Sequence, residues 1–209
     1  MKSRILLTGF DPFAGESINP ALEAVRLIPE CINDVIIHKV TVPTVFERSI
    51  KVVREAIRVK NPNAVVCVGQ AGGRAEITIE RVAINIDDAR IPDNEGGQPI
   101  DEVIVAGGPP AYFSTLPIKA IAQAILEAGI PASVSTSAGT FVCNHLMYGV
   151  LDILAKEYPS SISGFIHVPF IPSQAMVKSP IPPSMPLEDI IRGLEIALSI
   201  IIRYMQDMK

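Results

Sequence analysis

The sequence predicts an α/β protein with a parallel or mixed sheet that carries helices on both faces. Apolar and β-branched segments typical of buried strands alternate with amphipathic helical segments along almost the whole chain. No internal repeat or low-complexity linker interrupts this alternation. A chain of 209 residues is long enough for one domain with a full hydrophobic core, so we expect residues 1–209 to form a single domain.

Six segments have the character of strands. Most are short apolar or β-branched runs, which suit the buried strands of a parallel sheet. One segment alternates instead, with Ile77 and Ile79 on one face and Thr78 and Glu80 on the other, as an extended strand or hairpin arm does. The expected strands are residues 4–8, 34–42, 64–68, 76–86, 132–136 and 164–168.

Five helices are expected between and after these strands. The first has Asn19 as its N-cap and Pro20 at its first position, and Gly129 stops the third. Residues 87–110 and 171–186 are rich in Gly or Pro, so we expect irregular structure there. The expected helices are residues 19–28, 44–60, 117–128, 140–158 and 187–205.

The composition is that of a folded protein with a large apolar interior. Hydrophobic residues make up 48% of the chain and charged residues 19%, and the mean hydropathy is +0.36. These values fit either a large buried core or apolar surface that is covered between subunits. The net charge of −4 comes without a basic stripe, so we expect no nucleic-acid partner. No signal peptide or membrane-length apolar run is recognisable, so we expect a cytoplasmic protein without membrane contact.

The loops that follow the strands are the expected places for chemistry. In sheets of this kind, ligands bind beyond the carboxyl ends of the strands. We therefore expect four segments to meet at one rim of the sheet, namely residues 9–19, 69–74, 137–143 and 168–169.

Of the three cysteines, only Cys143 has the surroundings of a nucleophile. Cys67 lies inside an apolar run, and Cys31 has no neighbouring base. Cys143 follows a turn of small residues and begins a helix, where the helix dipole favours a thiolate and free backbone N–H groups could bind an oxyanion. The alternative is a buried cysteine that acts as a small hydrophobic residue. The odd number and wide spacing argue against disulfides, and the lack of a CxxC pair argues against zinc.

His167 and Glu80 are the candidate partners of Cys143. His167 ends an apolar strand at the expected rim, whereas His145 lies two residues from Cys143 on one helix and therefore faces elsewhere. Glu80 could orient His167 as the third member of a triad. The residues alone leave open a core histidine, and a surface ion pair between Glu80 and Arg81.

Two of the loops have an unusual composition. Residues 69–74 are rich in glycine, but they match neither a P-loop nor the GxGxxG signature of a dinucleotide site. Phe10 and Phe13 flank an Asp-Pro pair at a strand end. The two rings either pack into the core or line a pocket.

Five blocks of sequence carry a resemblance to a known family. The blocks are TGFDPFAGESINP at 8–20, GQAGGRAEITIERVAINIDDARIPDNEG at 69–96, AYFSTLP at 111–117, SAGTFVCNHLMY at 137–148 and SGFIHVPFIPSQ at 163–174. They span nearly the whole chain, and in this order they resemble the pyroglutamyl peptidases, or pyrrolidone carboxyl peptidases, of bacteria and archaea.

The resemblance implies a fold, an assembly and a set of site residues. The fold would be a three-layer α/β/α sandwich with a mixed, mostly parallel central sheet, similar to phosphorylase and hydrolase folds, with residues 1–209 as one peptidase domain. The assembly would be a homotetramer with neither a metal nor an organic cofactor. The implied catalytic residues are Glu80, Cys143 and His167. The implied substrate-binding residues are Phe10, Phe13, Gln70, Arg90, Ile91, Phe141 and Val142.

We therefore expect hydrolysis of the amide bond after an N-terminal pyroglutamyl residue, through a thioester. Phe10 and Phe13 would hold the lactam ring, and Arg90 would lie on the oxyanion side. His167 would take the thiol proton of the cysteine, either during the reaction or already in a resting thiolate–imidazolium pair. The alternatives are a cysteine amidohydrolase of another specificity, a nucleoside- or phosphate-binding protein, and a catalytically silent binding module.

Overall fold

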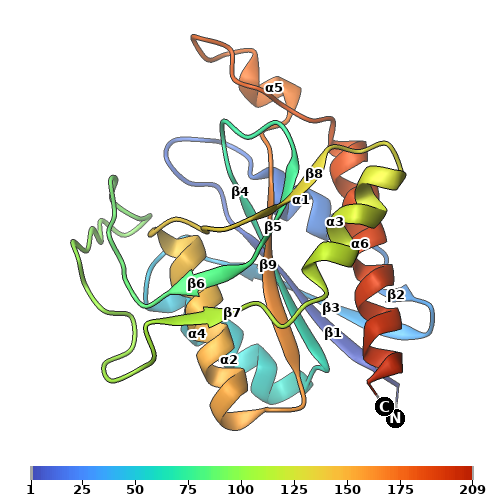
Figure 1. The fold of residues 1–209 in the computed structure, drawn as a ribbon. Helices are drawn as coiled ribbons and strands as arrows, with labels where there is room; N and C mark the ends of the chain where they lie inside the picture. Colours follow the sequence, from blue (N-terminus) through green and yellow to red (C-terminus); the bar gives the residue numbers. More distant parts are fainter. Residues whose placement is uncertain (1, 209) are drawn as a thin grey trace.

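A twisted sheet of seven strands forms the centre of the computed structural model, which describes residues 2–208 (Figure 1). The strands of this sheet are β1 (Arg4–Phe10), β2 (Cys31–Ile32), β3 (Val35–Val42), β4 (Ala64–Gln70), β5 (Ile77–Glu80), β8 (Ala132–Ser135) and β9 (Ile162–Val168). Two short strands, β6 (Val82–Ile84) and β7 (Ala111–Phe113), pair in a separate antiparallel sheet.

The sheet is mixed but mostly parallel, as the sequence predicted. Its strand order is β2-β3-β1-β4-β9-β5-β8. Strands β3, β1, β4 and β9 run in one direction. Strands β5 and β8 are parallel to each other, but β5 runs antiparallel to β9. The short edge strand β2 is antiparallel to β3.

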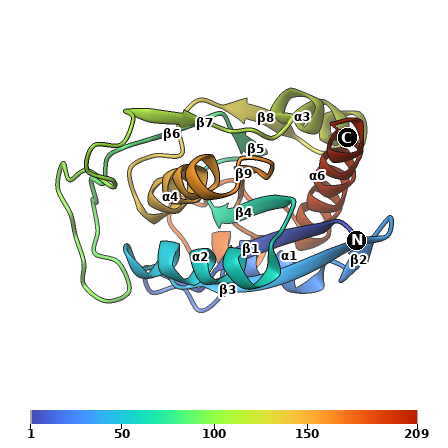
Figure 2. The ribbon, with the colours of Figure 1, turned by 90° about the horizontal axis from the view of Figure 1, so that it is seen from below.

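Helices cover both faces of the sheet and complete three layers (Figures 1 and 2). The helices are α1 (Pro20–Leu27), α2 (Arg48–Lys60), α3 (Ile118–Glu127), α4 (Val142–Glu157), α5 (Pro172–Ala175) and α6 (Leu187–Asp207). One core packs α1, α3 and α6 against one face, and a second packs α2 and α4 against the other. Successive strand residues alternate between the two cores: Leu6 belongs to the second, and its neighbours Ile5 and Leu7 belong to the first.

The helix expected at residues 44–60 begins only at Arg48, because acidic side chains bind the backbone before it. Asp11 Oδ1 accepts a hydrogen bond from the Thr44 N–H at 2.7 Å. Asp93 Oδ2 accepts one from the Phe46 N–H at 3.0 Å. These contacts hold the segment as a turn, and the helix starts after it.

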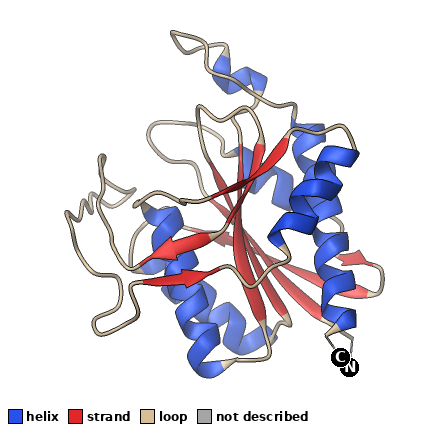
Figure 3. Ribbon diagram, viewed as in Figure 1, coloured by secondary structure: helices blue, strands red, loops and turns tan. Residues whose placement is uncertain are grey.

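The expected strand at residues 76–86 is divided between two sheets, as Figure 3 shows by the separate red arrows of β5 and β6. Strand β5 joins the central sheet, and β6 pairs with β7 beside α4. Strands β2 and β7 were not predicted, since two- and three-residue strands leave little pattern in a sequence.

The segment 171–186 is irregular apart from the single turn of α5, as its proline content indicated. It projects beyond the body of the protein at the top of Figure 1. Met176, Val177 and Ile181 on this arm are 68%, 82% and 70% exposed. Within residues 2–208, none of the helices has the length and apolarity that a membrane crossing requires.

Candidate active site

The two-residue period of the strands places Glu80 and His167 on the same face of the sheet, the face covered by α4. Ile77 and Ile79 of β5 lie in the core on the other face, so Glu80 points toward α4. Phe165 of β9 lies in the core under α4, and the same period directs His167 there as well. Because β5 pairs with β9, the two polar side chains become neighbours.

Glu80 and His167 form a buried hydrogen bond. The distance from His167 Nδ1 to Glu80 Oε1 is 2.8 Å, and the two residues are 4% and 0% exposed. An ionised carboxylate can only accept, so the imidazole carries its proton on Nδ1 and leaves Nε2 free to accept another. The imidazole also packs against the ring of Phe165, with centroids 4.7 Å apart. The tautomer and the orientation of His167 are therefore both fixed.

Cys143 reaches this pair from the first turn of α4. Its position is defined by Gly69, which lies opposite His167 in the ladder between β4 and β9. A Cβ added to Gly69 would lie 3.0 Å from Cys143 Sγ and 2.7 Å from the ring of Phe165. Only glycine leaves room for both, so the thiol lies over the end of β4, beside the strand position that pairs with His167.

The expectation that four segments meet at one rim is confirmed. Strands β1, β4 and β9 are parallel, and their carboxyl ends lie together. Residues 137–143 join them, since Ser137 accepts a hydrogen bond from Arg74 and Cys143 lies beside Gly69, although β8, which precedes this segment, runs opposite to β9. The chain after β8 instead approaches from the side, and the N-terminus of α4 brings Cys143 to the end of β4.

The surroundings favour a neutral thiol and a neutral imidazole at rest. Burial, reinforced by the charge of Glu80, raises the pKa of Cys143 to about 12. Burial lowers the pKa of His167 and outweighs the opposing hydrogen bond and charge of Glu80. Burial would raise the pKa of Glu80, but hydrogen bonds from His167, Ser135 and Arg74 outweigh it and hold that pKa below its ordinary value. These shifts favour the neutral pair over a resting thiolate–imidazolium pair.

Alkylation of Cys143 should report this protonation state. In a Cys31→Ser background, the rate constant for reaction with iodoacetamide should rise with pH from about 7 to about 10 without a plateau, because only the thiolate reacts and its pKa is raised. Peptide mass spectrometry would assign the label, and N-acetylcysteine in the same buffers would serve as the unperturbed thiol. A plateau near neutral pH would show a resting ion pair instead.

A cavity of about 380 Å³ lies in front of the N-terminus of α4 and contains four of the predicted substrate-binding residues. The rings of Phe13 and Phe141 are 6.2 Å apart there, and Arg90 brings an exposed guanidinium. Aromatic faces with few polar groups suit a small, flat ligand. The lining residues are Phe13, Asp88, Arg90, Ile91, Gly139, Thr140 and Phe141.

The other three predicted substrate-binding residues are buried around this cavity. Phe10 is 2% exposed and packs against Phe165, with ring centroids 6.2 Å apart. Its ring therefore contacts the phenylalanine on which His167 packs. Val142 is completely buried as the first residue of α4. Gln70 is 8% exposed, and its Oε1 accepts a hydrogen bond from Gln174 at 3.1 Å. Of the two phenylalanines in the first loop, one packs into the core and one lines the pocket.

Sequence reasoning missed Arg74 as a partner of Glu80. The alternative partner for the carboxylate was Arg81, but Arg74 Nη1 forms the ion pair with Glu80 Oε1, at 2.7 Å. The spacing of six residues between Arg74 and Glu80 does not indicate a contact in the sequence. The contact depends on how the loop after β4 turns back over β5.

His145 faces away from Cys143, as its position on the helix predicted. Its Nδ1 lies 2.6 Å from Asp87 Oδ2, in the buried contact between α4 and the loop after β6.

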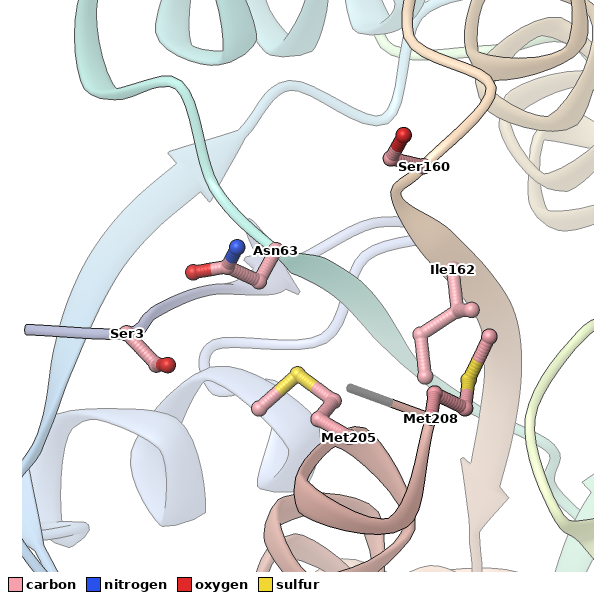
Figure 4. Close-up of a pocket in the computed structure, with 6 residues that line it drawn as sticks. All are labelled: Ser3, Asn63, Ser160, Ile162, Met205 and Met208. Atoms are coloured by element: carbon pink, nitrogen blue, oxygen red, sulfur yellow. The ribbon is translucent and has the colours of Figure 1, made fainter.

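A further cavity of about 340 Å³ lies at the amino ends of the strands, between α6 and the starts of β4 and β9 (Figure 4). It is far from the triad and is lined by Ser3, Asn63, Ser160, Ile162, Met205 and Met208. Within residues 2–208, no cluster of three or more His, Cys, Asp or Glu side chains is arranged to hold a metal ion.

Comparisons with known proteins agree with this geometry. The family model described as pyroglutamyl peptidase matches residues 3–204. The pyrrolidone-carboxylate peptidase of Clostridium perfringens is 55% identical over 206 residues, which cover 99% of this chain and 96% of that protein. The crystal structure of pyroglutamyl peptidase I from Bacillus amyloliquefaciens superposes with a TM-score of 0.92 at 52% identity, over 96% of this chain and 95% of that one.

A more distant structure leads to the same family. A mutant pyrrolidone carboxyl peptidase from Pyrococcus furiosus superposes with a TM-score of 0.94 at 42% identity, over 96% of this chain and 99% of that one. The resemblance predicted from the five sequence blocks is confirmed, and the chain belongs to the pyroglutamyl peptidase family.

Proposed function

We propose that Cys143, His167 and Glu80 together hydrolyse the amide bond that follows an N-terminal pyroglutamyl residue of a peptide. Membership of the family makes the protein a cysteine peptidase that removes N-terminal pyroglutamate. The observation that carries the residue assignment is the buried 2.8 Å hydrogen bond between Glu80 and His167, on the sheet face over which α4 holds the thiol. A base held by a carboxylate beside a thiol is the arrangement that acyl transfer requires.

The reaction begins with a proton transfer, because the surroundings raise the pKa of the Cys143 thiol. His167 Nε2 takes the proton from Cys143 as the sulfur attacks the pyroglutamyl carbonyl carbon. The negative charge moves to the carbonyl oxygen, where the backbone N–H of Cys143 and the guanidinium of Arg90 stabilise it. The C–N bond then breaks, and the imidazolium gives its proton to the departing amine. Water, activated by His167, hydrolyses the thioester and releases pyroglutamate.

The cavity beside Phe13 and Phe141 selects the lactam by its polar atoms. Pyroglutamate is neutral and carries one ring N–H and one ring C=O, whereas an N-terminal glutamine brings an ammonium whose desolvation is costly. Proline lacks the ring carbonyl and would leave a donor of the pocket unpaired. Such a loss costs about 1–3 kcal/mol, or roughly ten- to a hundredfold in rate.

A panel of fluorogenic amides tests both the pocket and the nucleophile. The pyroglutamyl amide should be hydrolysed at least about tenfold faster than the prolyl amide, and the glutaminyl amide should not be hydrolysed measurably. Iodoacetamide should abolish the activity. Equal rates on the prolyl and pyroglutamyl amides would contradict the pocket assignment, and activity that survives complete alkylation of Cys143 would contradict the nucleophile.

We further propose that residues 1–209 are one peptidase domain that assembles as a homotetramer in the cytoplasm. A single seven-stranded central sheet with a core on each face supports the single domain. The exposed apolar side chains of the arm at residues 171–186 support self-association. Three unpaired thiols, of Cys31, Cys67 and Cys143, suit a reducing compartment. Sedimentation of the purified protein would test the subunit number.

A further inference from the structure

Arg74 connects the segments that carry the triad. It lies in the loop between β4 and β5, and its guanidinium reaches across to β5. Nη1 donates hydrogen bonds to Glu80 Oε1, at 2.7 Å, and to Thr78 Oγ1. Nη2 donates to the carbonyl oxygen of Ser137, at 3.3 Å, on the segment that leads to the nucleophile. One side chain thus holds β5 and the approach to Cys143 in fixed relation.

One oxygen of the Glu80 carboxylate accepts hydrogen bonds from both Arg74 and His167. Oε1 accepts from Arg74 and from His167, while Glu80 itself is completely buried. A buried carboxylate with only a neutral imidazole beside it would be an uncompensated charge. The guanidinium supplies the countercharge, and its Nη1 holds the same oxygen, Oε1, that accepts from the imidazole. The direction in which Glu80 presents its oxygen to the imidazole therefore depends on Arg74.

The charges of Arg74 and Glu80 shift the pKa values of His167 and Cys143 in opposite directions. Glu80 raises the pKa of His167, and Arg74 acts on it in the lowering direction, as burial does. Arg74 likewise counters the rise in the pKa of Cys143 that burial, Glu80 and the neighbouring Cys67 produce. With Arg74 present, the imidazole stays unprotonated at neutral pH and the thiolate is easier to form.

We infer that Arg74 is a positioning residue of the catalytic site, which acts through Glu80 to hold His167 in the orientation and charge state that accept the thiol proton. This inference rests on the proposed function of the triad. Arg74 does not belong to the residues that line the substrate cavity. Its loss should therefore appear in the catalytic step and in the pH dependence, and much less in substrate affinity.

The test compares Arg74→Met, Arg74→Lys and Arg74→Ala with wild type on the fluorogenic pyroglutamyl amide. Arg74→Met should lower kcat about 10- to 100-fold with little change in KM, because a charged hydrogen bond is lost. The acid limb of its kcat/KM profile should move to higher pH, since the charge that lowered the pKa of His167 is gone. Arg74→Lys keeps the positive charge. The acid limb of its kcat/KM profile should therefore lie at the wild-type pH, and its kcat should lie between those of Arg74→Met and wild type.

Chemical rescue and a matched control separate positioning from general stability. The Arg74 side chain is 31% exposed, so guanidinium from solution can enter the space left in Arg74→Ala. Guanidinium chloride far below unfolding concentrations should raise its kcat, whereas sodium chloride at equal ionic strength should not. Arg54→Met removes a surface ion pair with Glu157 between α2 and α4, and should keep wild-type kinetics.

Two results would overturn the inference. One is an Arg74→Met variant with wild-type kcat and an unmoved acid limb. The other is an equal loss of kcat in Arg74→Met and Arg74→Lys with no shift in pH dependence and no response to guanidinium, which would indicate a purely structural residue. Either result leaves the triad standing if wild type hydrolyses the pyroglutamyl amide and iodoacetamide abolishes that activity. If wild type has no such activity, the proposed function fails instead.

Discussion

Replacing Cys143 with serine should lower kcat by at least about 10⁴-fold while substrate affinity changes by no more than a few fold. A serine hydroxyl is a much weaker acid and nucleophile than a thiol, and this site gives it little help. Burial already raises the pKa of the thiol to about 12, and the imidazole that must take the proton has its own pKa lowered. An alcohol in the same place would transfer its proton to His167 far less readily.

Binding should survive, because the substitution leaves the side chains that line the cavity in place. Its lining includes Phe13, Arg90 and Phe141 but not Cys143. Calorimetry with pyroglutamate as ligand would measure affinity, and the fluorogenic amide would measure kcat. Cys31→Ser is the matched control, since Cys31 is exposed on the edge strand and should be silent. A Cys143→Ser enzyme with more than a tenth of wild-type turnover would remove Cys143 from the nucleophile position.

Much of this site could be predicted from local patterns. The alternation of Ile77, Thr78, Ile79 and Glu80 already assigned the glutamate to the face opposite Ile77 and Ile79, and the structure confirms that assignment. The N-cap at Asn19 was equally local: its side chain accepts a hydrogen bond from the Ala21 N–H, at 3.0 Å. Patterns of this kind are visible because the period of a strand or the cap of a helix is determined by neighbours in sequence.

The features that could not be predicted depend on contacts between distant segments. The antiparallel direction of β5 relative to β9 depends on the path of the chain after Gln70, which no local pattern determines. The choice of Arg74 over Arg81 as the partner of Glu80 follows from that path. The delayed start of α2 has the same origin, because it depends on Asp93, more than forty residues away in sequence.

Replacing Glu80 with glutamine should lower kcat about 10³- to 10⁴-fold and also destabilise the protein at neutral pH. An amide can turn its NH₂ group toward His167 Nδ1, which forces the proton of the imidazole onto Nε2 and blocks its role as a base. It also leaves the guanidinium of Arg74 without its countercharge. Because Glu80 raises the pKa of His167, the acid limb of the remaining activity should move to lower pH. Loss of Arg74 should move it in the opposite direction.

The stability difference should itself depend on pH. The pKa of Glu80 is lower in the folded protein than in the unfolded chain, so the unfolded chain binds its proton first as pH falls. The stabilisation by Glu80 is fully present above its unfolded pKa of about 4.3 and disappears as pH falls through the folded value. Urea unfolding should therefore show wild type and Glu80→Gln well separated at neutral pH and converging in acid.

Glu157→Gln is the matched control for this measurement. Glu157 pairs with Arg54 on the surface at 45% side-chain exposure, so its loss should change the free energy of unfolding by less than about 0.5 kcal/mol. A Glu80→Gln variant whose stability tracks that of Glu157→Gln at every pH would mean that the buried carboxylate is not ionised in the fold. The hydrogen bond to His167 would then join two neutral groups, and Arg74 would lose its role as countercharge.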